Sequence, residues 1–237
     1  MKDKKFDVHV HHIMAICGGF LGTYAILARF SIFGSAQTAN LIEVCKALLG
    51  KNFIEVLIRL GALGIYITSI VIATIVEKKM KGNVKIVTLI LECAVIFVLG
   101  FFPENMNPMI ALYPIFFITA FQWCIFKGAK GYVSATIFST NNVKQTVVSL
   151  VEYCMLEQEK EEERSEKWEK AKFFGGSLLG FHLGVCIGYV CYQFFGIHSI
   201  WCCMIPMVGN MILLWIQEKQ EKVIYQSPLS AASISGK

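Results

Sequence analysis

FIEVLIRLGALGIYITSIVIATIV, residues 53–76, is apolar almost throughout and holds only two charged side chains. A helix needs about 20 such residues to cross the roughly 30 Å hydrocarbon layer of a membrane. The sequence predicts six membrane-spanning segments of this kind: Ile13–Phe33, Phe53–Val76, Val84–Phe102, Met109–Phe126, Phe173–Phe195 and Ile200–Ile216. We therefore expect an all-α fold, a polytopic membrane helix bundle forming a single membrane domain over residues 1–237.

The composition favours the same class. Hydrophobic residues make up 55 % of the chain, charged residues 16 %, and the mean hydropathy is +0.57. A soluble domain of this length needs more charge to cover its surface. The net charge of +5 suits attraction to anionic head groups. Membrane lipid is therefore an expected partner, and nucleic acid is not.

Motifs for catalysis and for metal binding are missing from the sequence. It contains no phosphate-binding glycine loop, no nucleophile elbow and no two-histidine metalloprotease helix. Most of the nine cysteines lie within apolar stretches, where cysteine is a small packing residue. Cys202 and Cys203 are adjacent, without the spacing of a zinc motif. We expect no metal, no cofactor, no catalytic residue and no enzymatic activity.

Lysine and arginine are concentrated in alternate connections between the predicted spans. The N-terminus, the connections after the second and fourth spans, and the C-terminal tail are basic, whereas 103–108 and 196–199 contain neither residue. Because cytoplasmic loops carry this excess, both termini are predicted to be cytoplasmic, with 220–237 as a cytoplasmic tail, polar and disordered from 227 onward. The first connection does not fit, since Lys46 and Lys51 would lie outside.

Two similar motifs divide the chain into halves. Thr38-Ala39-Asn40 follows the first predicted span, and Thr140-Asn141-Asn142 follows the fourth. Divided at residues 103–108, the halves 1–102 and 109–219 hold three spans each. An odd number of spans gives the two repeats opposite, inverted topology.

Each motif is predicted to begin a short, broken or re-entrant helix after the first or fourth span. Such segments in matching positions of inverted repeats indicate a site near the middle of the membrane. The candidate substrate-binding residues are Thr38, Asn40, Thr140, Asn142 and the mid-span Gln122. The alternative is that both are surface helices, with Thr and Asn acting as N-caps.

The residues around these motifs resemble a known family. GGFLGTY at 18–24 with AQTAN at 36–40, and GYVSAT at 131–136 with TNN at 140–142, are similar to paired motifs of the YoaK-like family. The resemblance implies a six-helix, multi-pass protein of the bacterial cytoplasmic membrane, of unknown function. The family shows an intramembrane Asp where this chain has Gly22, and motif glycines where it has Ala39 and Asn141. A proton-coupled role for that carboxylate is therefore not carried over.

Ionisable residues in the middle of a predicted span are costly and mark function or paired packing. Glu92 and His182 are a candidate coupling pair for ion or proton movement. The alternatives are a buried Glu92–Arg59 pair, or a protonated Glu92 hydrogen-bonded to a neighbour. Arg29, near the end of the first span, is expected to extend its side chain to the membrane interface.

The fifth predicted span carries glycines at every fourth position: Gly176, Gly180, Gly184 and Gly188. Small residues on one helix face let a neighbouring backbone approach closely, so this stripe predicts tight helix packing. A glycine-lined path is the alternative. Separately, the expected partners include a second copy of the chain in a homo-oligomer. The charged stretch 156–172 before it is expected to be a solvated cytoplasmic helix.

Together these features favour a small secondary transporter or permease for an unknown small molecule or ion, with its site between the two repeats. The alternative is a non-transporting membrane scaffold or assembly factor. That alternative predicts a closed, fully packed bundle and a function for the charged helix.

Overall fold

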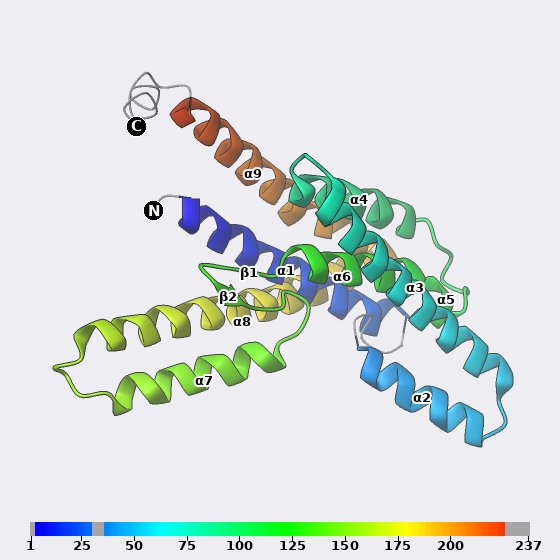
Figure 1. The fold of residues 1–237 in the computed structure, drawn as a ribbon. Helices are drawn as coiled ribbons and strands as arrows, with labels where there is room; N and C mark the ends of the chain where they lie inside the picture. Colours follow the sequence, from blue (N-terminus) through cyan, green and yellow to red (C-terminus); the bar gives the residue numbers. More distant parts are fainter. Residues whose placement is uncertain (1–2, 30–35, 226–237) are drawn as a thin grey trace.

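The computed structural model describes residues 3–29 and 36–225, and these form a bundle of long helices (Figure 1). The elements are α1 (Asp3–Arg29), α2 (Gln37–Leu49), α3 (Phe53–Lys79), α4 (Val84–Leu99), α5 (Pro108–Ala111), α6 (Tyr113–Ile125), β1 (Gly128–Ala129), β2 (Tyr132–Val133), α7 (Thr140–Met155), α8 (Glu161–Phe195), the 3₁₀ helix η1 (Gly196–Cys203) and α9 (Met204–Tyr225). The fold is helical, as expected, apart from one short hairpin. Residues 226–237 of the predicted tail lie outside the described residues, and α9 continues through 220–225.

Within residues 3–29 and 36–225, four stretches are long and apolar enough to cross a membrane: Phe6–Arg29, Phe53–Lys79, Pro108–Ile125 and Glu161–Gln220. This number is smaller than the six predicted spans for two reasons. The helix α4 has only 16 residues, fewer than the roughly 20 that a full crossing needs. The last stretch contains two predicted spans, because η1 joins α8 to α9 without an extended break.

Asparagine side chains begin three of the helices. Asn52 accepts a hydrogen bond from the backbone N–H of Glu55 at the start of α3, and Asn83 does the same for Ile86 in α4. Asn107 accepts from two backbone N–H groups at the start of α5, where Pro108 has no N–H to satisfy. These caps fix where each helix begins, and so where the turn before it ends.

The fourth predicted span, Met109–Phe126, is interrupted. It consists of α5 and α6, which meet at Leu112 and Tyr113. Pro114 lies in the first turn of α6, where its missing N–H costs no helical hydrogen bond.

The helices α1 and α6 form the centre of the bundle. The most apolar 18 residues of each stretch differ in burial. They are 72 % buried in α1 and 61 % buried in α5 with α6, against 28 % in α3 and 33 % in the α8–α9 stretch. The helix α1 packs against α8, α9 and η1, while α6 packs against α3 and α4. In addition, α4 packs against α9, α2 against α3, and α7 against α8. The outer faces of α3 and α8 expose many large apolar side chains, as lipid-facing helices do.

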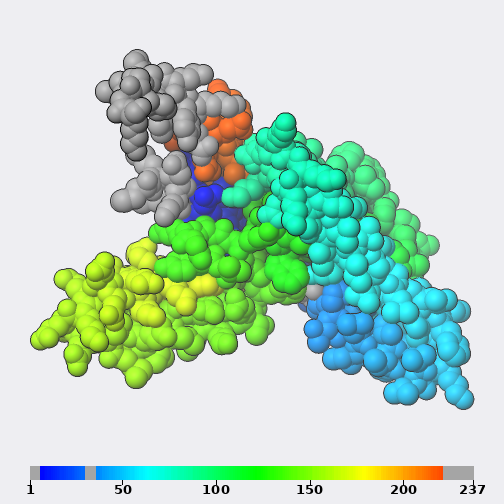
Figure 2. All heavy atoms as spheres, in the orientation of Figure 1, coloured from blue at the N-terminus to red at the C-terminus, as the bar shows by residue number. Residues whose placement is uncertain are grey.

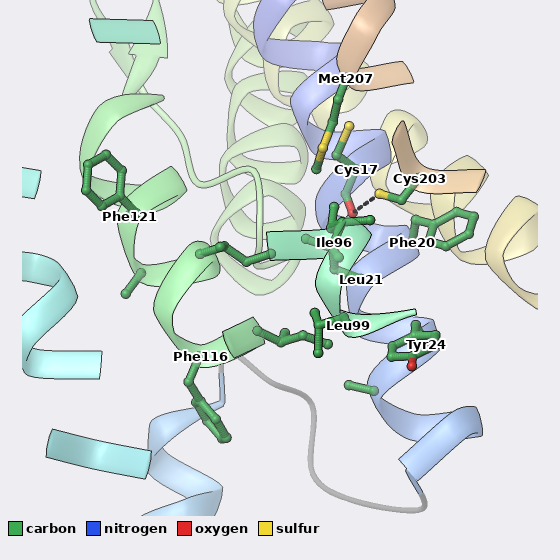
Figure 3. Packing of buried hydrophobic residues seen from close by; sticks show 14 of the residues in the cluster. Cys17, Phe20, Leu21, Tyr24, Ile96, Leu99, Phe116, Phe121, Cys203 and Met207 are labelled. Atoms are coloured by element: carbon green, nitrogen blue, oxygen red, sulfur yellow. Dashed lines mark hydrogen bonds between the residues drawn. The ribbon is translucent and has the colours of Figure 1, made fainter. Parts of the chain in front are cut away.

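Side chains from α1, α4, α6, η1 and α9 share one apolar core (Figure 3). Phe20 and Leu21 of α1 are buried beside Ile96 of α4. The sulfur of Cys203 points toward the backbone carbonyl of Cys17 at 3.9 Å. The nine cysteines are all free thiols.

The glycine stripe of α8 lies against α1. A side chain at Gly176 or Gly180 would meet His12, one at Gly184 would meet the backbone of Ile16, and one at Gly188 would meet Thr23 and Phe20. From the other side, Gly19 of α1 lies against the backbone carbonyl of Phe181. The two backbones are therefore in direct contact, which leaves no room for a glycine-lined path between them.

Two helical hairpins project from this centre as separate lobes (Figure 2). One consists of α2 and the first part of α3, the other of α7 and the first part of α8. In the second lobe Tyr153 contacts the Trp168 ring at 5.4 Å, and Lys167 binds Glu152 at 2.8 Å. The Lys167 ammonium lowers the pKa of the Glu152 carboxyl. Residues 161–172 of the charged stretch form the outer part of α8.

We expect Gly184→Leu to separate α1 from α8, because the added side chain would displace the backbone of Ile16. Overpacking lowers the free energy of unfolding by about 1–3 kcal/mol, because side chains and backbone must shift to make room. The unfolding midpoint in detergent should fall by about 4 °C or more, and size-exclusion chromatography should show aggregation. Gly64→Leu in α3 is the matched control, since beyond the nearby backbone of α3 itself its added Cβ meets no described atom within 4 Å. Equal behaviour of the two variants would contradict the packing.

Candidate functional site

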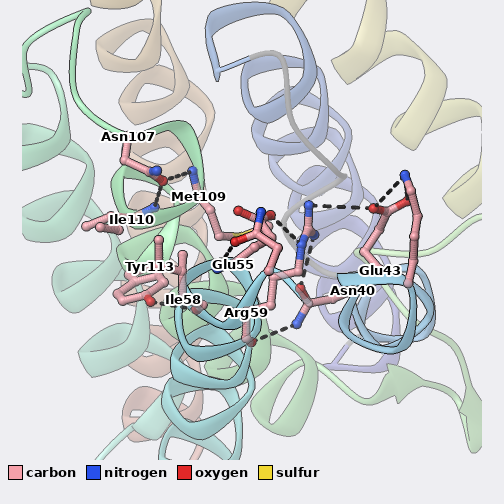
Figure 4. A network of polar contacts seen from close by, with 11 residues as sticks. Asn40, Glu43, Glu55, Ile58, Arg59, Asn107, Met109, Ile110 and Tyr113 are labelled. Atoms are coloured by element: carbon pink, nitrogen blue, oxygen red, sulfur yellow. Dashed lines mark hydrogen bonds and ion pairs between the residues drawn. The ribbon is translucent and has the colours of Figure 1, made fainter. Parts of the chain in front are cut away.

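The short helix α2 is attached to α3 through Asn40, which is fully buried (Figure 4). Its Nδ2 donates to the backbone carbonyl of Arg59 at 3.1 Å and to the Gln37 side chain at 3.3 Å. Its Oδ1 accepts from Arg59 Nη1 at 3.5 Å. Thr38, two residues earlier, is exposed. Asn40 therefore holds the start of α2, and Thr38 is accessible there.

Arg59 is neutralised by acids close to it in the chain. Its Nε lies 2.6 Å from Glu55, one turn earlier on α3, and Nη2 lies 3.9 Å from Glu43 of α2. The predicted Glu92–Arg59 pair is thus not formed, because two nearer carboxylates occupy the guanidinium.

The chain reaches α7 through a hairpin and an extended segment. The strands β1 and β2 pair antiparallel, with Gly131 at φ +84° in the turn between them, a conformation that glycine adopts without strain. Residues 134–139 then run along the bundle without helical structure. We call them the α7 leader.

Asn142 fixes the α7 leader to the start of α7. Its Oδ1 accepts a hydrogen bond from Ser134 Oγ at 2.8 Å. Its Nδ2 donates to the carbonyls of Ala135 at 2.9 Å and Phe138 at 3.2 Å. Asn142 is fully buried, whereas Thr140 is exposed. Asn142 thus provides partners for backbone that leaves the helical pattern.

Gln122 of α6 joins the same leader to α1. Its Nε2 donates to Thr136 Oγ1 at 2.8 Å and to the Met14 carbonyl at 3.1 Å. Its Oε1 is buried and has no hydrogen bond within the described ranges. The leader also lies directly against Gly18, where any side chain would collide with the carbonyl of Thr136. Gly18 is therefore required for α1 and the leader to meet.

The starts of α2 and α7 open onto one pocket of about 260 Å³. Its lining residues are Ala36, Ile137, Phe138, Ser139, Thr140 and Phe181. Ala36 precedes α2, Ser139 precedes α7, and Phe181 belongs to α8. In Figure 1 the two short helices begin near the middle of the bundle and lead away from it in opposite directions.

A family model described as "Protein of unknown function (DUF1275)" matches residues 10–214. The chain belongs to the DUF1275 family. The match runs from α1 into α9 and includes both short helices. No curated protein and no solved structure matches the chain. Family membership therefore supports the expectation of an uncharacterised family, and the name YoaK-like stays a resemblance.

In this DUF1275 chain the pocket brings together only part of the predicted site. Thr140 lines it, and Thr38 is exposed in the first turn of α2 near Ala36. Asn40, Asn142 and Gln122 are buried and support the surrounding elements through hydrogen bonds. The sequence did not reveal that Gly18, Ser134 and Thr136 hold the α7 leader in place. The glycine pair at 18–19 within an apolar stretch was the available signal for close backbone contact.

The candidate coupling pair is not assembled. Glu92 is fully buried in α4, and neither of its oxygens has a hydrogen bond to a described residue. His182 is exposed on α8, where its Nδ1 contacts the Leu178 carbonyl at 2.9 Å. The two residues therefore face different environments. No described group of three His, Cys, Asp or Glu side chains is arranged to hold a metal ion.

We expect Asn142→Ala to destabilise the protein by about 2 kcal/mol or more, since each buried group left without a partner costs about 1–3 kcal/mol. Ser134 and the carbonyls of Ala135 and Phe138 would lose their partner. Hydrogen exchange should increase in residues 134–139, and the unfolding midpoint should fall. Asn141→Ala, at the exposed neighbouring position, should stay within about 0.5 kcal/mol. Unchanged exchange in Asn142→Ala would show that the leader has other support.

Proposed function

We propose that this chain is a small secondary transporter or permease of the cytoplasmic membrane, with its substrate site between two inverted three-helix repeats. One observation carries the proposal: two short helices about a hundred residues apart begin at a single pocket. Interrupted helices in matching positions of two repeats form the substrate sites of many secondary transporters.

The packing of the helices is consistent with two related halves. Exchanging α1 with α6, α2 with α7, α3 with α8 and α4 with α9 relates three pairs of packed helices to three others, whereas the pairs that involve η1 or α5 have no counterpart. Thus α1–α8 corresponds to α6–α3, α1–α9 to α6–α4, and α2–α3 to α7–α8. The first long helix of each half is also the more buried one. With three crossings per half, including the short α4, the halves would have opposite orientation in the membrane.

Both short helices would begin deep in the hydrocarbon layer. Asn40 contacts Arg59, six residues after the first residue of α3, which corresponds to about 9 Å of helix. Thr140 shares the pocket with Phe181, eight residues after the start of the apolar stretch at Phe173, or about 12 Å. The middle of a 30 Å layer lies about 15 Å from either side.

The pocket combines polar groups with apolar walls. The first N–H groups of a helix lack partners within it, so two helix starts supply backbone donors. Thr140 adds a hydroxyl, while Ile137, Phe138 and Phe181 form apolar walls. This chemistry suits a small, partly apolar molecule that carries hydrogen-bond acceptors.

Native cysteines test the inverted topology. Cys45 in α2 and Cys154 in α7 are both exposed on the projecting hairpins. In intact cells a membrane-impermeant maleimide should label Cys45, and it should label Cys154 only after permeabilisation. Labelled peptides are identified by mass spectrometry, with the exposed Cys186 of α8 as the lipid-facing control that stays unlabelled. Labelling of Cys45 and Cys154 from the same side would exclude the inverted arrangement.

A thermal-shift screen with small metabolites tests the shared site. A ligand that binds the folded chain raises its unfolding midpoint. We expect Thr140→Val to reduce the shift produced by a hit, because the valine lacks the hydroxyl at the pocket. Thr68→Val, an exposed position on α3 outside the pocket, is the matched control and should keep the full shift. A hit unaffected by Thr140→Val would place its site elsewhere.

The projecting α7–α8 hairpin favours a second candidate function, that of a membrane scaffold or assembly factor. Val147, Val151 and Met155 of α7 are exposed on this lobe beside the charged first turns of α8. A scaffold would keep its function when Thr140 is replaced and lose it when this lobe is altered. The transporter proposal predicts the reverse.

A further inference from the structure

Arg29, the last residue of α1, is almost fully buried, with only 2 % of its surface exposed. It therefore does not extend to the membrane interface as its sequence position predicted. Nη1 donates to the carbonyl of Pro103 at 2.8 Å, and Nη2 donates to that of Phe102 at 3.2 Å. Its Nε has no hydrogen bond to any described residue. Arg29 thus joins α1 to the turn after α4 and keeps one buried donor unused.

The charge of Arg29 also lacks an acidic partner. Among the ion pairs of the described residues, none involves this guanidinium. An arginine side chain stays charged when it is buried. A buried charge without a counter-charge is strongly unfavourable, and two carbonyl dipoles compensate it only in part.

A pocket of about 290 Å³ lies beside this guanidinium. It is bounded by Ala28, Arg29, Glu104, Pro108, Tyr192 and Ile197. These residues belong to α1, the turn after α4, α5, α8 and η1, so this pocket is separate from the one at α2 and α7. The Tyr24 hydroxyl also lies close to the guanidinium.

We propose that this pocket binds a small oxyanion, a carboxylate or a phosphate, through the guanidinium of Arg29. The guanidinium N–H groups that do not bond the carbonyls of Pro103 and Phe102 donate to the anion, and a charge-assisted bond of this kind is about twice as strong as a neutral one. Glu104 is exposed at the pocket and is not within 4 Å of Arg29. Its negative charge repels an incoming anion and limits the affinity of the site.

The proposal differs from a purely structural role for Arg29 in what it predicts for Glu104. If Arg29 only held the carbonyls of Pro103 and Phe102, anion binding would not depend on the exposed carboxylate of Glu104. An anion site should bind more tightly when that carboxylate is neutralised. Glu104→Gln is therefore the informative variant, and its exposed position leaves the fold intact.

The experiment is calorimetric titration of the full chain in detergent with sodium acetate and with sodium phosphate, at constant ionic strength. The wild-type chain should show saturable binding of at least one of them. Glu104→Gln should tighten it about two- to fivefold, as expected for removing one exposed like charge. Arg29→Lys keeps the charge but loses the planar fork, and Arg29→Gln loses both. Both should weaken binding, the second by about tenfold or more.

A second arm distinguishes a soluble anion from a lipid head group. The unfolding midpoint is compared in nanodiscs of phosphatidylglycerol and of phosphatidylcholine, for the wild-type chain and for Arg29→Lys. Stabilisation by phosphatidylglycerol that Arg29→Lys removes, without binding of acetate or free phosphate, assigns the site to a lipid phosphate. Absence of binding by all three probes, or binding that Arg29→Lys and Glu104→Gln leave unchanged, overturns the proposal.

Discussion

Backbone N–H and carbonyl groups that lie outside helices within a packed bundle need other hydrogen-bond partners. The α7 leader is the segment of this chain to which that constraint applies most directly. Asn142 provides for the carbonyls of Ala135 and Phe138, and Gln122 binds the Thr136 side chain. Gly18 leaves the space that the leader occupies. Without these contacts α7 could not begin beside the centre of the bundle, and α2 and α7 would not share a pocket.

Much of this arrangement could be predicted from local sequence. The apolar stretches correspond to the long helices, and the short helices α2 and α7 occur at the two positions where the paired Thr and Asn motifs indicate them. The glycines of α8 lie against α1, because a stripe at every fourth position can serve a single neighbouring helix. These features depend on periodicity within one segment, which a sequence displays directly.

The missed features depend on distances between segments. Arg59 binds Glu55 and Glu43 rather than Glu92, since a carboxylate one turn away on the same helix needs no particular tertiary arrangement. The two motif asparagines also differ in use. Asn40 attaches α2 to another helix, whereas Asn142 stabilises its own leader. Similar sequences in the two halves therefore did not reveal which neighbours each residue would meet.

The backbone contact between α1 and α8 limits where a solute could travel. Along Gly176, Gly180, Gly184 and Gly188 the two helices are too close for a water molecule or an acyl chain to pass between them. That side of α1 is therefore sealed over about three helical turns. A permeation route past α1 would therefore have to follow its other side, where the non-helical backbone of residues 134–139 lies against Gly18. That segment could be displaced without breaking a long helix.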